Sequence, residues 1–434
     1  MYRSAYNDLI RWKNQKERKP LLLQGARQVG KTHLVSEFGK KEYKKFISLN
    51  FEQDTRLSKL FDTSLEPSSL ITNISLYLGQ KISSEDTLLF FDEVQVATRV
   101  LTSLKYFHEQ APEYHIIAAG SLLGVSIGKQ SSFPVGKVDF LTLYPMSFSE
   151  YLIEAGEELF IDVLEAMEKP DPFPDPIHEK MLGHLKLYLF LGGMPEILNS
   201  YFKEKDISKV RSLQNDILNA YERDFSKYSD RNQAIRTSEF WNSIPRQLMR
   251  ENKKFKYSEI GPNARAFKFE QTLEWLRKAG IIHLSYNIVT PKNPLSTHCD
   301  FSKFKIFMHD VGLLAAKLNI SSEQIVFPDA LFREYYGAFI ENFVAQELVC
   351  SGMGSLYYWT SRSDAEVDFI LESNQKIYPL EVKSGSSRNL KSLKSYAGKY
   401  HPQKLFRVSP RNLFQSDDFI NIPLYCLGFL KKLI

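Results

Sequence analysis

The chain has 434 residues, of which 43% are hydrophobic and 25% charged, so a largely disordered or fibrous protein is excluded. Its length predicts about two to four domains. Lys and Arg number 56 against 51 Asp and Glu, and the resulting net charge of +5 permits nucleic-acid binding without arguing for it. Three cysteines lie far apart with no C-x-x-C pair, which argues against a disulfide framework or structural zinc site and favours a reducing, cytoplasmic location.

The N-terminal segment MYRSAYNDLIRWKNQ is polar and amphipathic, and it lacks the apolar core of a secretory signal peptide. The longest apolar stretch, about 116–127, is interrupted by Gly and Ser and is too short to cross a bilayer. We therefore expect a protein that does not associate with membranes.

The first third of the chain alternates apolar strands with helical stretches. A helix over about 5–17 precedes a strand at 20–24, and a second helix begins near Lys31. Further strands are expected at 44–52, 87–95, 114–121 and 136–148, with a helix at 100–110. Apolar strands joined by helices predict an α/β fold with a parallel sheet covered on both faces.

The rest of the chain changes character after a proline-rich segment. Four prolines within 170–176 predict an exposed loop. The stretches 178–228, interrupted by GGMP at 192–195, and 232–325 have mostly helical patterns, with a helix running into a β-hairpin over 270–289. The last hundred residues predict a helix at 334–350 and strands at 356–359, 366–371 and 377–383.

One segment carries a phosphate-binding loop (P-loop). Residues 25–32 read GARQVGKT and fit G-x-x-x-x-G-K-[ST] between an apolar strand and a helix. The glycines allow backbone N–H groups to turn toward phosphate oxygens, and the helix N-terminus favours the anion. Lys31 is expected to reach the β- and γ-phosphates of ATP, and Thr32 to offer a hydroxyl to Mg²⁺. The nucleotide-binding residues are therefore predicted to be Gly25, Ala26, Arg27, Gln28, Val29, Gly30, Lys31, Thr32 and His33.

A second strand end supplies the acids that ATP hydrolysis needs. The run LLFFDE at 88–93 is a buried-strand pattern that ends in Asp92 and Glu93. Asp92 is expected to hold Mg²⁺ through water, and Glu93 to polarise the attacking water. Ser121, after the next strand, is a candidate sensor of the γ-phosphate, so Glu93, Lys31 and Ser121 are the predicted catalytic residues. The arginine finger is left open among Arg27, Arg99 and Arg223.

Several further motifs lie along the chain: LYPMSFSEYL, FLGGMPE, YERDFSKY, AGIIHLSY, HDVGLLAA, FIENFVAQEL, YYWTSRSDAEVDFIL and PLEVKSG. Together with QGARQVGKT, FFDEVQ and AAGSLLG, the sequence resembles the AAA-type P-loop ATPases of bacteria and archaea that carry an uncharacterised C-terminal domain. The resemblance implies an AAA-like core (1–165), a helical lid (166–230), a winged-helix-like module (231–325) and a C-terminal α/β domain similar to restriction-type nucleases (326–434).

The segment 263–280 predicts a helix with an apolar stripe of Ala266, Phe269, Leu273 and Leu276. Basic and polar side chains lie off this stripe or just upstream: Arg265, Lys268, Gln271, Lys253, Lys254 and Lys256. A basic helix before a hairpin suits a DNA groove. The competing interpretation, which the small net charge favours, is a solvated face or one packed on the ATPase.

Near the C-terminus, Asp368 and Glu381 lie in apolar strand patterns, and alternation places Lys383 on the same face as Glu381. Glu341, in the preceding helix, is expected to join them. Two carboxylates and a lysine suit metal-assisted phosphodiester cleavage, with Asp368 and Glu381 binding Mg²⁺ and Lys383 orienting water. A surface Glu–Lys salt bridge explains the pair equally well.

These patterns predict a P-loop enzyme that hydrolyses ATP with Mg²⁺ to switch or drive the C-terminal domain, with nucleic acid such as DNA as a candidate partner. A protein partner or self-association is also compatible. The alternatives are an ATP-gated Mg²⁺-dependent DNA nuclease and a nucleotide-dependent scaffold or regulator whose C-terminal domain only binds.

Overall fold

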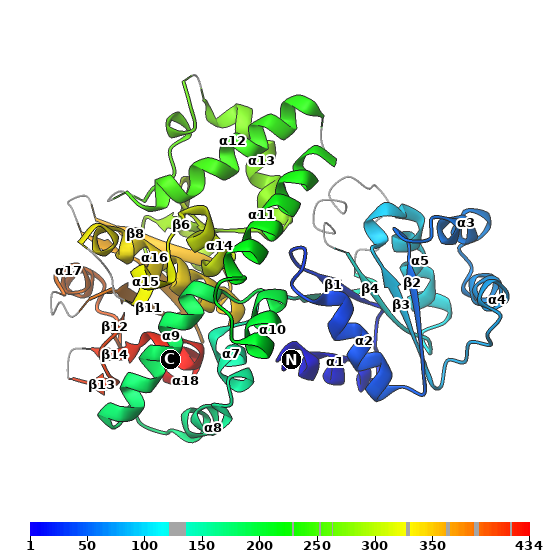
Figure 1. The fold of residues 1–434 in the computed structure, drawn as a ribbon, viewed down its shortest axis with the longest axis horizontal. Coiled ribbons are helices and arrows are strands. Elements are labelled where there is room, and N and C mark those ends of the chain that lie inside the picture. The colour runs from blue at the N-terminus through cyan, green and yellow to red at the C-terminus, as the bar shows by residue number, and fades with distance from the viewer. Residues whose placement is uncertain are drawn as a thin grey trace. The chain divides into compact units, whose positions relative to one another are not determined.

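The computed structural model describes the chain except for residues 121–135, 228–229, 251–252, 263, 327–329, 362–364, 386–389 and 417–418. It separates into two compact units (Figure 1). The first unit comprises residues 2–144 with 278–280, and the second comprises residue 1, 145–277 and 281–434. The finer boundaries after residues 165, 230 and 325 stay predictions.

The first unit is an α/β domain with a five-stranded parallel sheet in the order β2-β3-β4-β1-β5, which confirms the predicted fold class. Its strands are β1 (Leu21–Gln24), β2 (Lys45–Asn50), β3 (Thr87–Asp92), β4 (His115–Ala119) and β5 (Asp139–Thr142). Its helices are α1 (Ala5–Lys13), α2 (Lys31–Glu42), α3 (Arg56–Thr63), α4 (Pro67–Leu78), η1 (Val94–Val96) and α5 (Thr98–Gln110).

Strand β3 is buried throughout, with an apolar run at 88–91, because both faces of the sheet are covered, as is typical of parallel sheets. Leu89 and Phe91 point into a core formed with α3, α4 and α5. On the other face, Phe90 stacks on Phe46, with ring centroids 6.1 Å apart. Gly39 of α2 approaches Phe46 so closely that an added Cβ would lie 2.2 Å from its ring. Glycine at 39 therefore allows α2 to pack tightly on the sheet.

The second unit holds the other elements. Its helices are α7 (Phe148–Glu154), α8 (Glu158–Ala166), α9 (Asp175–Leu191), α10 (Pro195–Glu204), α11 (Val210–Lys227), α12 (Arg231–Leu248), η2 (Tyr257–Glu259), α13 (Ala266–Lys278), η3 (Leu295–His298), α14 (Val311–Lys317), α15 (Ser322–Val326), α16 (Ala330–Cys350), α17 (Lys391–Tyr400), η4 (Leu424–Phe429) and α18 (Leu430–Leu433). Its strands are β6 (Ile282–Ile288), β7 (Cys299–Met308), β8 (Leu356–Thr360), β9 (Glu366–Val367), β10 (Phe369–Ser373), β11 (Lys376–Val382), β12 (Phe406–Ser409), β13 (Phe414–Gln415) and β14 (Ile420–Pro423).

Two mixed sheets organise the second unit, in the orders β7-β6-β8-β9 and β10-β11-β12-β14-β13. The expected helix-into-hairpin is α13 followed by the antiparallel pair β6 and β7. Strand β6 also pairs in parallel with β8, so the hairpin shares a sheet with strands from the C-terminal hundred residues. The expected single strand at 366–371 is interrupted at Asp368, where the chain passes from one sheet to the other.

Helix α16 runs through the interior of the second unit, and every residue from Ala338 to Leu348 is buried. Its polar side chains bind backbone groups that the regular elements leave unpaired. Asn342 accepts from the N–H of Met308 at 2.8 Å and donates to its carbonyl at 3.1 Å. The side-chain oxygen of Gln346 accepts from the N–H of Val311 at 2.8 Å. These bonds fix the end of β7 and the start of α14 against α16.

The same helix holds the segment before α7. Glu347 accepts from the N–H of Phe148 at 2.9 Å, while the amide of Gln346 donates to the hydroxyl of Tyr188 at 2.8 Å. The Tyr188 hydroxyl in turn donates to the carbonyl of Met146 at 2.5 Å. Burial raises the pKa of Glu347 to about 8, and the nearby carboxylate of Glu150 adds to this shift. Glu347 is therefore mostly neutral at pH 7.

Asp310 anchors a neighbouring turn. It caps α14 by accepting from the N–H of Leu313 at 2.9 Å, and its other oxygen accepts from the N–H of Gly193 at 2.6 Å. Gly192 has a φ of +76°, and an added Cβ there would lie 2.3 Å from the Asp310 carboxylate. Glycine at 192 is thus required by the close approach of Asp310, and glycine at 193 by Met146, whose carbonyl oxygen would lie 2.1 Å from an added Cβ.

Three further expectations can be compared with the structure. The first helix ends at Lys13, earlier than expected, and the proline-rich loop ends at Pro174, where α9 begins with Asp175. The three cysteines are free, in line with a chain without disulfides. Among the described residues, no helix is both long and apolar enough to cross a membrane.

The raised pKa of Glu347 predicts a pH dependence of stability. The folded carboxyl keeps its proton up to about pH 8, whereas the unfolded one loses it near pH 4.5. The stability from this group is therefore full below pH 4.5 and is lost as pH rises through 8, a loss on the order of a few kcal/mol. We expect Glu347→Gln to flatten the fall in melting temperature between pH 6 and 8.5. Exposed Glu158→Gln is the control; equal pH profiles for wild type and Glu347→Gln would refute this assignment.

Candidate functional site

The P-loop connects β1 to α2 and uses backbone conformations that favour glycine. Gly25 has a φ of +150°, and a Cβ there would lie 2.1 Å from the carbonyl oxygen of Leu143. Gly30, directly before α2, has a φ of +93°. Gln28 between them also has a positive φ, of +66°. The loop therefore turns its backbone tightly just before the N-terminus of α2, the end that favours an anion.

Lys31 begins α2 and is almost completely buried, with 7% of its surface exposed. Its ammonium donates to the carbonyls of Gly25 at 2.9 Å and Ala26 at 2.8 Å. Burial lowers the pKa of Lys31 to about 8, although the carboxylates of Glu93 and Asp92 partly oppose this. A phosphate oxygen would offer this cation a stronger, charged acceptor than the two loop carbonyls.

Thr32 and Asp92 meet between the loop and the end of β3. The Thr32 hydroxyl donates to a carboxylate oxygen of Asp92 at 2.9 Å. Burial raises the pKa of Asp92, while the hydrogen bond from Thr32 lowers it in part. The side-chain amide of Asn50 lies 3.4 Å from the same oxygen. Hydroxyl and carboxylate oxygens are ligand types that Mg²⁺ prefers, so Thr32 and Asp92 fit a hydrated magnesium ion, with the Asn50 amide as a donor to Asp92.

Asn50 was not among the residues expected from the sequence. It ends β2, directly beside Asp92 in the parallel register, and its side-chain oxygen accepts from the N–H groups of Glu52 and Gln53. The only signal in the sequence was a polar residue at a strand end. Its pairing with β3, which a single sequence does not specify, gives it a place in the site.

Glu93 follows β3 with a φ of +55°, a left-handed conformation that is uncommon for a residue with a side chain. Its N–H donates to Asp92 at 3.0 Å, and the amide of Gln95 donates to its carboxylate at 2.5 Å. Such strained residues cluster at functional sites, so the conformation supports a role for Glu93. Gln95 holds the carboxylate in one orientation.

Other expected site residues have different surroundings. Ser121 lies outside the described residues. The side chain of His33 is 73% exposed and lies 4.0 Å from Glu37. Arg27 lies 4.0 Å from Glu52, and Arg99 donates to the carbonyl of Phe61 at 2.7 Å. Arg223 lies on α11 of the second unit. The assignments of site residues, including the open arginine finger, stay predictions.

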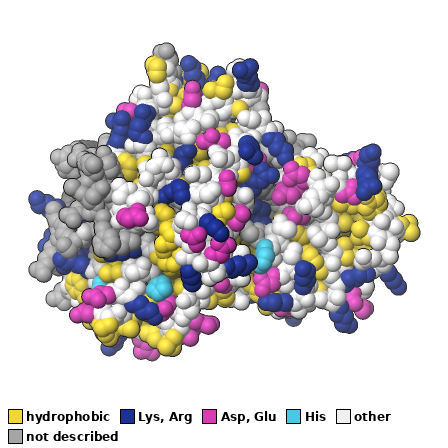
Figure 2. All heavy atoms as spheres, viewed as in Figure 1, with side chains coloured by type: hydrophobic (Ala, Val, Ile, Leu, Met, Phe, Trp, Pro, Cys, Tyr) yellow, Lys and Arg dark blue, Asp and Glu magenta, His cyan; other side chains and the backbone are white. Residues whose placement is uncertain are grey.

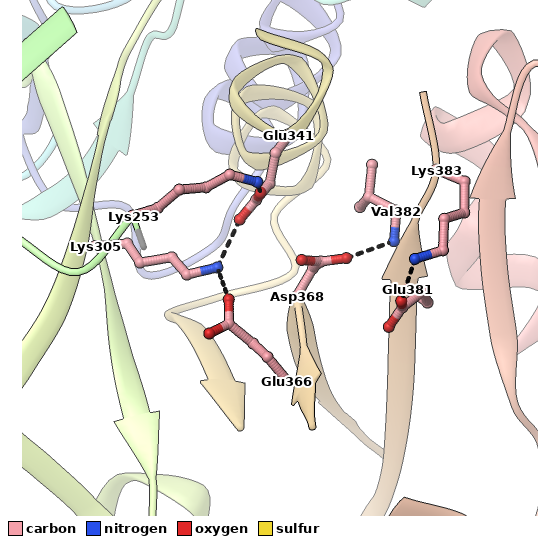
Figure 3. A network of polar contacts seen from close by, with 8 residues as sticks. All are labelled: Lys253, Lys305, Glu341, Glu366, Asp368, Glu381, Val382 and Lys383. Atoms are coloured by element: carbon pink, nitrogen blue, oxygen red, sulfur yellow. Dashed lines mark hydrogen bonds and ion pairs between the residues drawn. The ribbon is translucent and has the colours of Figure 1, made fainter. Parts of the chain in front are cut away.

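The C-terminal acids form a buried charge network with lysines from β7 and the segment after α12 (Figure 3). Lys305, which is 0% exposed, binds Glu341 and Glu366, both at 2.7 Å. Lys253 also binds Glu341. Burial alone would raise the pKa of Glu341, but the two lysines outweigh it and hold this pKa well below its usual range. Lys253, one of the basic residues expected just upstream of the 263–280 helix, is thus partly buried as a partner of Glu341.

Asp368 and Glu381 extend the network past the point where the chain passes from one sheet to the other. Figure 3 shows Asp368 between the lysine pair and β11. Asp368 accepts from the N–H of Val382 at 2.8 Å, and Lys383 donates to Glu381 at 2.5 Å. Burial, with added repulsion from Glu341 and Glu381, raises the pKa of Asp368 to about 8. The second carboxylate oxygen of Glu381 is buried without a hydrogen-bond partner.

The structure thus brings Glu341, Asp368, Glu381 and Lys383 into one region, as expected. Two features differ from the expectation: Asp368 lies at the break between β9 and β10, and Glu341 is neutralised by lysines. Among the described residues, no group of three or more His, Cys, Asp or Glu side chains is arranged to hold a metal ion. Metal binding at this network stays a prediction.

Three family models match separate parts of the chain. Residues 17–152 match an AAA domain, residues 182–324 a domain of unknown function (DUF8612), and residues 336–427 a second domain of unknown function (DUF4143). The chain therefore carries an AAA-type P-loop ATPase domain in its first third, which supports ATP binding and hydrolysis. No curated protein matches the chain.

Several solved structures are similar at low sequence identity. The Walker-type ATPase PABY2304 of Pyrococcus abyssi is 14% identical, covering 72% of this chain and 94% of its own, with a TM-score of 0.45. DnaA of Aquifex aeolicus bound to AMPPCP is 14% identical over 64% and 88%, with a TM-score of 0.30. The Aeropyrum pernix ORC1 protein in complex with DNA is 11% identical over 74% and 93%, with a TM-score of 0.28. Because these TM-scores are below 0.5, the assignment rests on the AAA family match.

The charge network predicts a large stability effect at Lys305. Replacing Lys305 by Met removes the cation that Glu341 and Glu366 share, and we expect a loss of about 3 kcal/mol because buried carboxylates lose their partner. Lys303→Met on the same strand is the matched control, since its side chain is 55% exposed and pairs with Asp300 at the surface. That control should cost less than about 1 kcal/mol. Urea unfolding measures both, and equal losses would show that the network contributes little.

Proposed function

We propose that this protein is an ATP-hydrolysing switch or motor in which the P-loop domain controls the C-terminal part of the chain. The observation that carries the proposal is the 2.9 Å contact between Thr32 and Asp92, which joins the P-loop to the end of β3. With Lys31 buried beside the same acids, the loop and strand end supply cation, hydroxyl and carboxylates around one point. This arrangement suits phosphoryl transfer to water.

Each side chain has a distinct role in the proposed reaction. Lys31 binds the β- and γ-phosphates, and the turned backbone of residues 25–30 donates to phosphate oxygens. Thr32 and Asp92 hold Mg²⁺, which neutralises phosphate charge when bound. Glu93 orients and accepts a proton from the attacking water, with Gln95 fixing its carboxylate. Ser121 is proposed to sense the γ-phosphate.

The second unit is proposed to receive the output of ATP hydrolysis. We propose a helical lid at 166–230, a winged-helix-like module at 231–325 and a restriction-nuclease-like domain at 326–434. DNA or another nucleic acid is the candidate partner, with a protein partner or self-association as the alternative. On the face drawn in Figure 2, basic side chains are interspersed with acidic ones, so nucleic-acid binding would rely on local sites. A cytoplasmic location is part of this proposal.

A second candidate function is ATP-gated, metal-dependent cleavage of DNA. The observation that favours it is the gathering of Asp368 and Glu381 beside Lys383, with one Glu381 oxygen buried and unpaired. Carboxylates in this position suit a divalent cation. The same contacts also suit a purely structural ion-pair network, which corresponds to a scaffold that binds without cutting.

The ATPase proposal predicts that ATP binding and ATP hydrolysis depend on different residues. Glu93→Gln keeps the shape of the side chain but removes the base, so ATP should bind while hydrolysis falls at least about 100-fold. Lys31→Ala should weaken ATP binding by about 1.5–3 kcal/mol through loss of a charge-assisted contact. Calorimetric titration with ATP and Mg²⁺ and a phosphate-release assay measure the two effects. If Glu93→Gln hydrolyses ATP at the wild-type rate, a residue other than Glu93 activates the attacking water.

The nuclease candidate predicts metal-dependent stabilisation. In the full chain carrying Asp92→Asn, which weakens the P-loop metal site, millimolar Mn²⁺ should raise the melting temperature by mass action. Asp368→Asn and Glu381→Gln should abolish this rise, whereas exposed Glu270→Gln should keep it. Lys383→Ala should keep the rise but remove cleavage of plasmid DNA. Without any Mn²⁺-dependent rise, the network is structural and the nuclease candidate fails.

A further inference from the structure

The second unit contains a cavity of about 670 Å³ that the proposed ATPase does not use. One wall is the end of α12 with the two residues that follow it, and the other is the end of α14 with the residues that follow it into α15. The residues that line it are Asn242, Pro245, Arg246, Met249, Arg250, Lys317, Leu318, Asn319, Ile320 and Gln324. The P-loop belongs to the first unit, so this cavity is a separate candidate site.

The charged side chains that line the cavity all have the same sign. Its lining includes three basic residues and no carboxylate. Arg246 lies in the last turn of α12, and Arg250 follows two residues after the end of that helix. Glu259 lies outside the lining and pairs with Arg250 at 2.6 Å, whereas Arg246 donates to the backbone carbonyl of Glu259, a neutral acceptor. Each guanidinium has five N–H groups, so these contacts leave donors that an anion can use.

Lys317 adds a third cation from the opposite wall. Its ammonium donates to Asn242 at 2.6 Å and lies over the ring of Trp241 at 5.0 Å. The nearest carboxylate contact of Lys317 is Glu222 at 3.8 Å, a distance that gives only a weak ion pair. Burial lowers the pKa of Lys317, with Glu222 opposing the shift. An anion in the cavity would compensate this charge better than Glu222 does.

The end of α14 could in principle repel an anion, because helix C-termini carry partial negative charge. Its last carbonyls are, however, already hydrogen-bonded. Asn319, with a φ of +52°, turns the chain so that its N–H donates to Ala316 at 3.0 Å and that of Ile320 donates to Ala315 at 3.0 Å. These capping bonds and the charge of Lys317 remove most of the repulsion.

Of the other lining residues, three carry amides and four are apolar, and the volume suits a small organic molecule. Pro245, Met249, Leu318 and Ile320 offer hydrocarbon surface beside the cations. Ligand sites typically have volumes of about 300–1,000 Å³ and combine apolar walls with a few fixed polar groups. We propose that this cavity binds an organic anion, in which a carboxylate or phosphate head group contacts Arg246, Arg250 and Lys317 and an apolar body lies against the four hydrocarbon side chains.

The test uses the full chain and the fluorescent aromatic anion 8-anilinonaphthalene-1-sulfonate. We expect one saturable site, with affinity reduced at least about tenfold in Arg246→Ala, because that variant loses a charge-assisted hydrogen bond to the anion. Met249→Glu should abolish binding by placing a carboxylate in the lining. Arg236→Ala, on the same helix but outside the lining, is the matched control and should bind as wild type. Circular dichroism establishes that each variant is folded.

Displacement of the fluorescent probe by other anions shows which anionic head group the cavity prefers. Octanoate and octyl phosphate each contain eight carbons, and the one that displaces the probe at lower concentration identifies the preferred anion. Octylamine, with the opposite charge, should not displace it. The proposal is overturned by the lack of saturable binding, by equal affinity in wild type and Arg246→Ala, or by equal displacement with octylamine. ATP binding at the P-loop is measured separately, so failure here leaves the proposed ATPase untouched.

Discussion

The second unit depends on one constraint: polar side chains on a fully buried helix must find partners. Helix α16 has no solvent-facing side between Ala338 and Leu348, yet it carries amides and carboxylates. An unpaired polar group there would cost several kcal/mol. Asn342, Gln346 and Glu347 meet this requirement by binding backbone groups of three other segments. Their positions therefore determine where β7, α14 and the start of α7 lie.

The same helix joins this framework to the charge network. Glu341 lies one residue before Asn342 and is compensated by Lys253 and Lys305 from distant parts of the sequence. A buried ion pair of this kind gives little net stability but is costly to break. It therefore favours one arrangement of helix and sheets over its alternatives, whether or not Asp368 and Glu381 also bind a metal.

In the P-loop of the first unit, the buried charges are less completely paired than those around α16. Within the described part of the chain, the Lys31 ammonium donates to two neutral carbonyls, and Asp92 accepts from a hydroxyl and from amide N–H groups. These charges are kept close to one another but incompletely compensated, which leaves them able to gain stability from phosphate and Mg²⁺. The strained backbone at Glu93 and the glycine conformations at Gly25 and Gly30 are further costs that such a site bears.

The sequence alone determined the parallel α/β domain, because its apolar strands and the GARQVGKT motif depend on local periodicity and local backbone conformation. It also placed Asp92 and Glu93 at a strand end. Tertiary structure alone decided which distant groups meet. Asn50 reaches Asp92 through strand pairing, and Lys253 reaches Glu341 across 88 residues. Residue patterns carry the period of a helix or strand, whereas such contacts depend on how elements pack, which a single sequence does not encode locally.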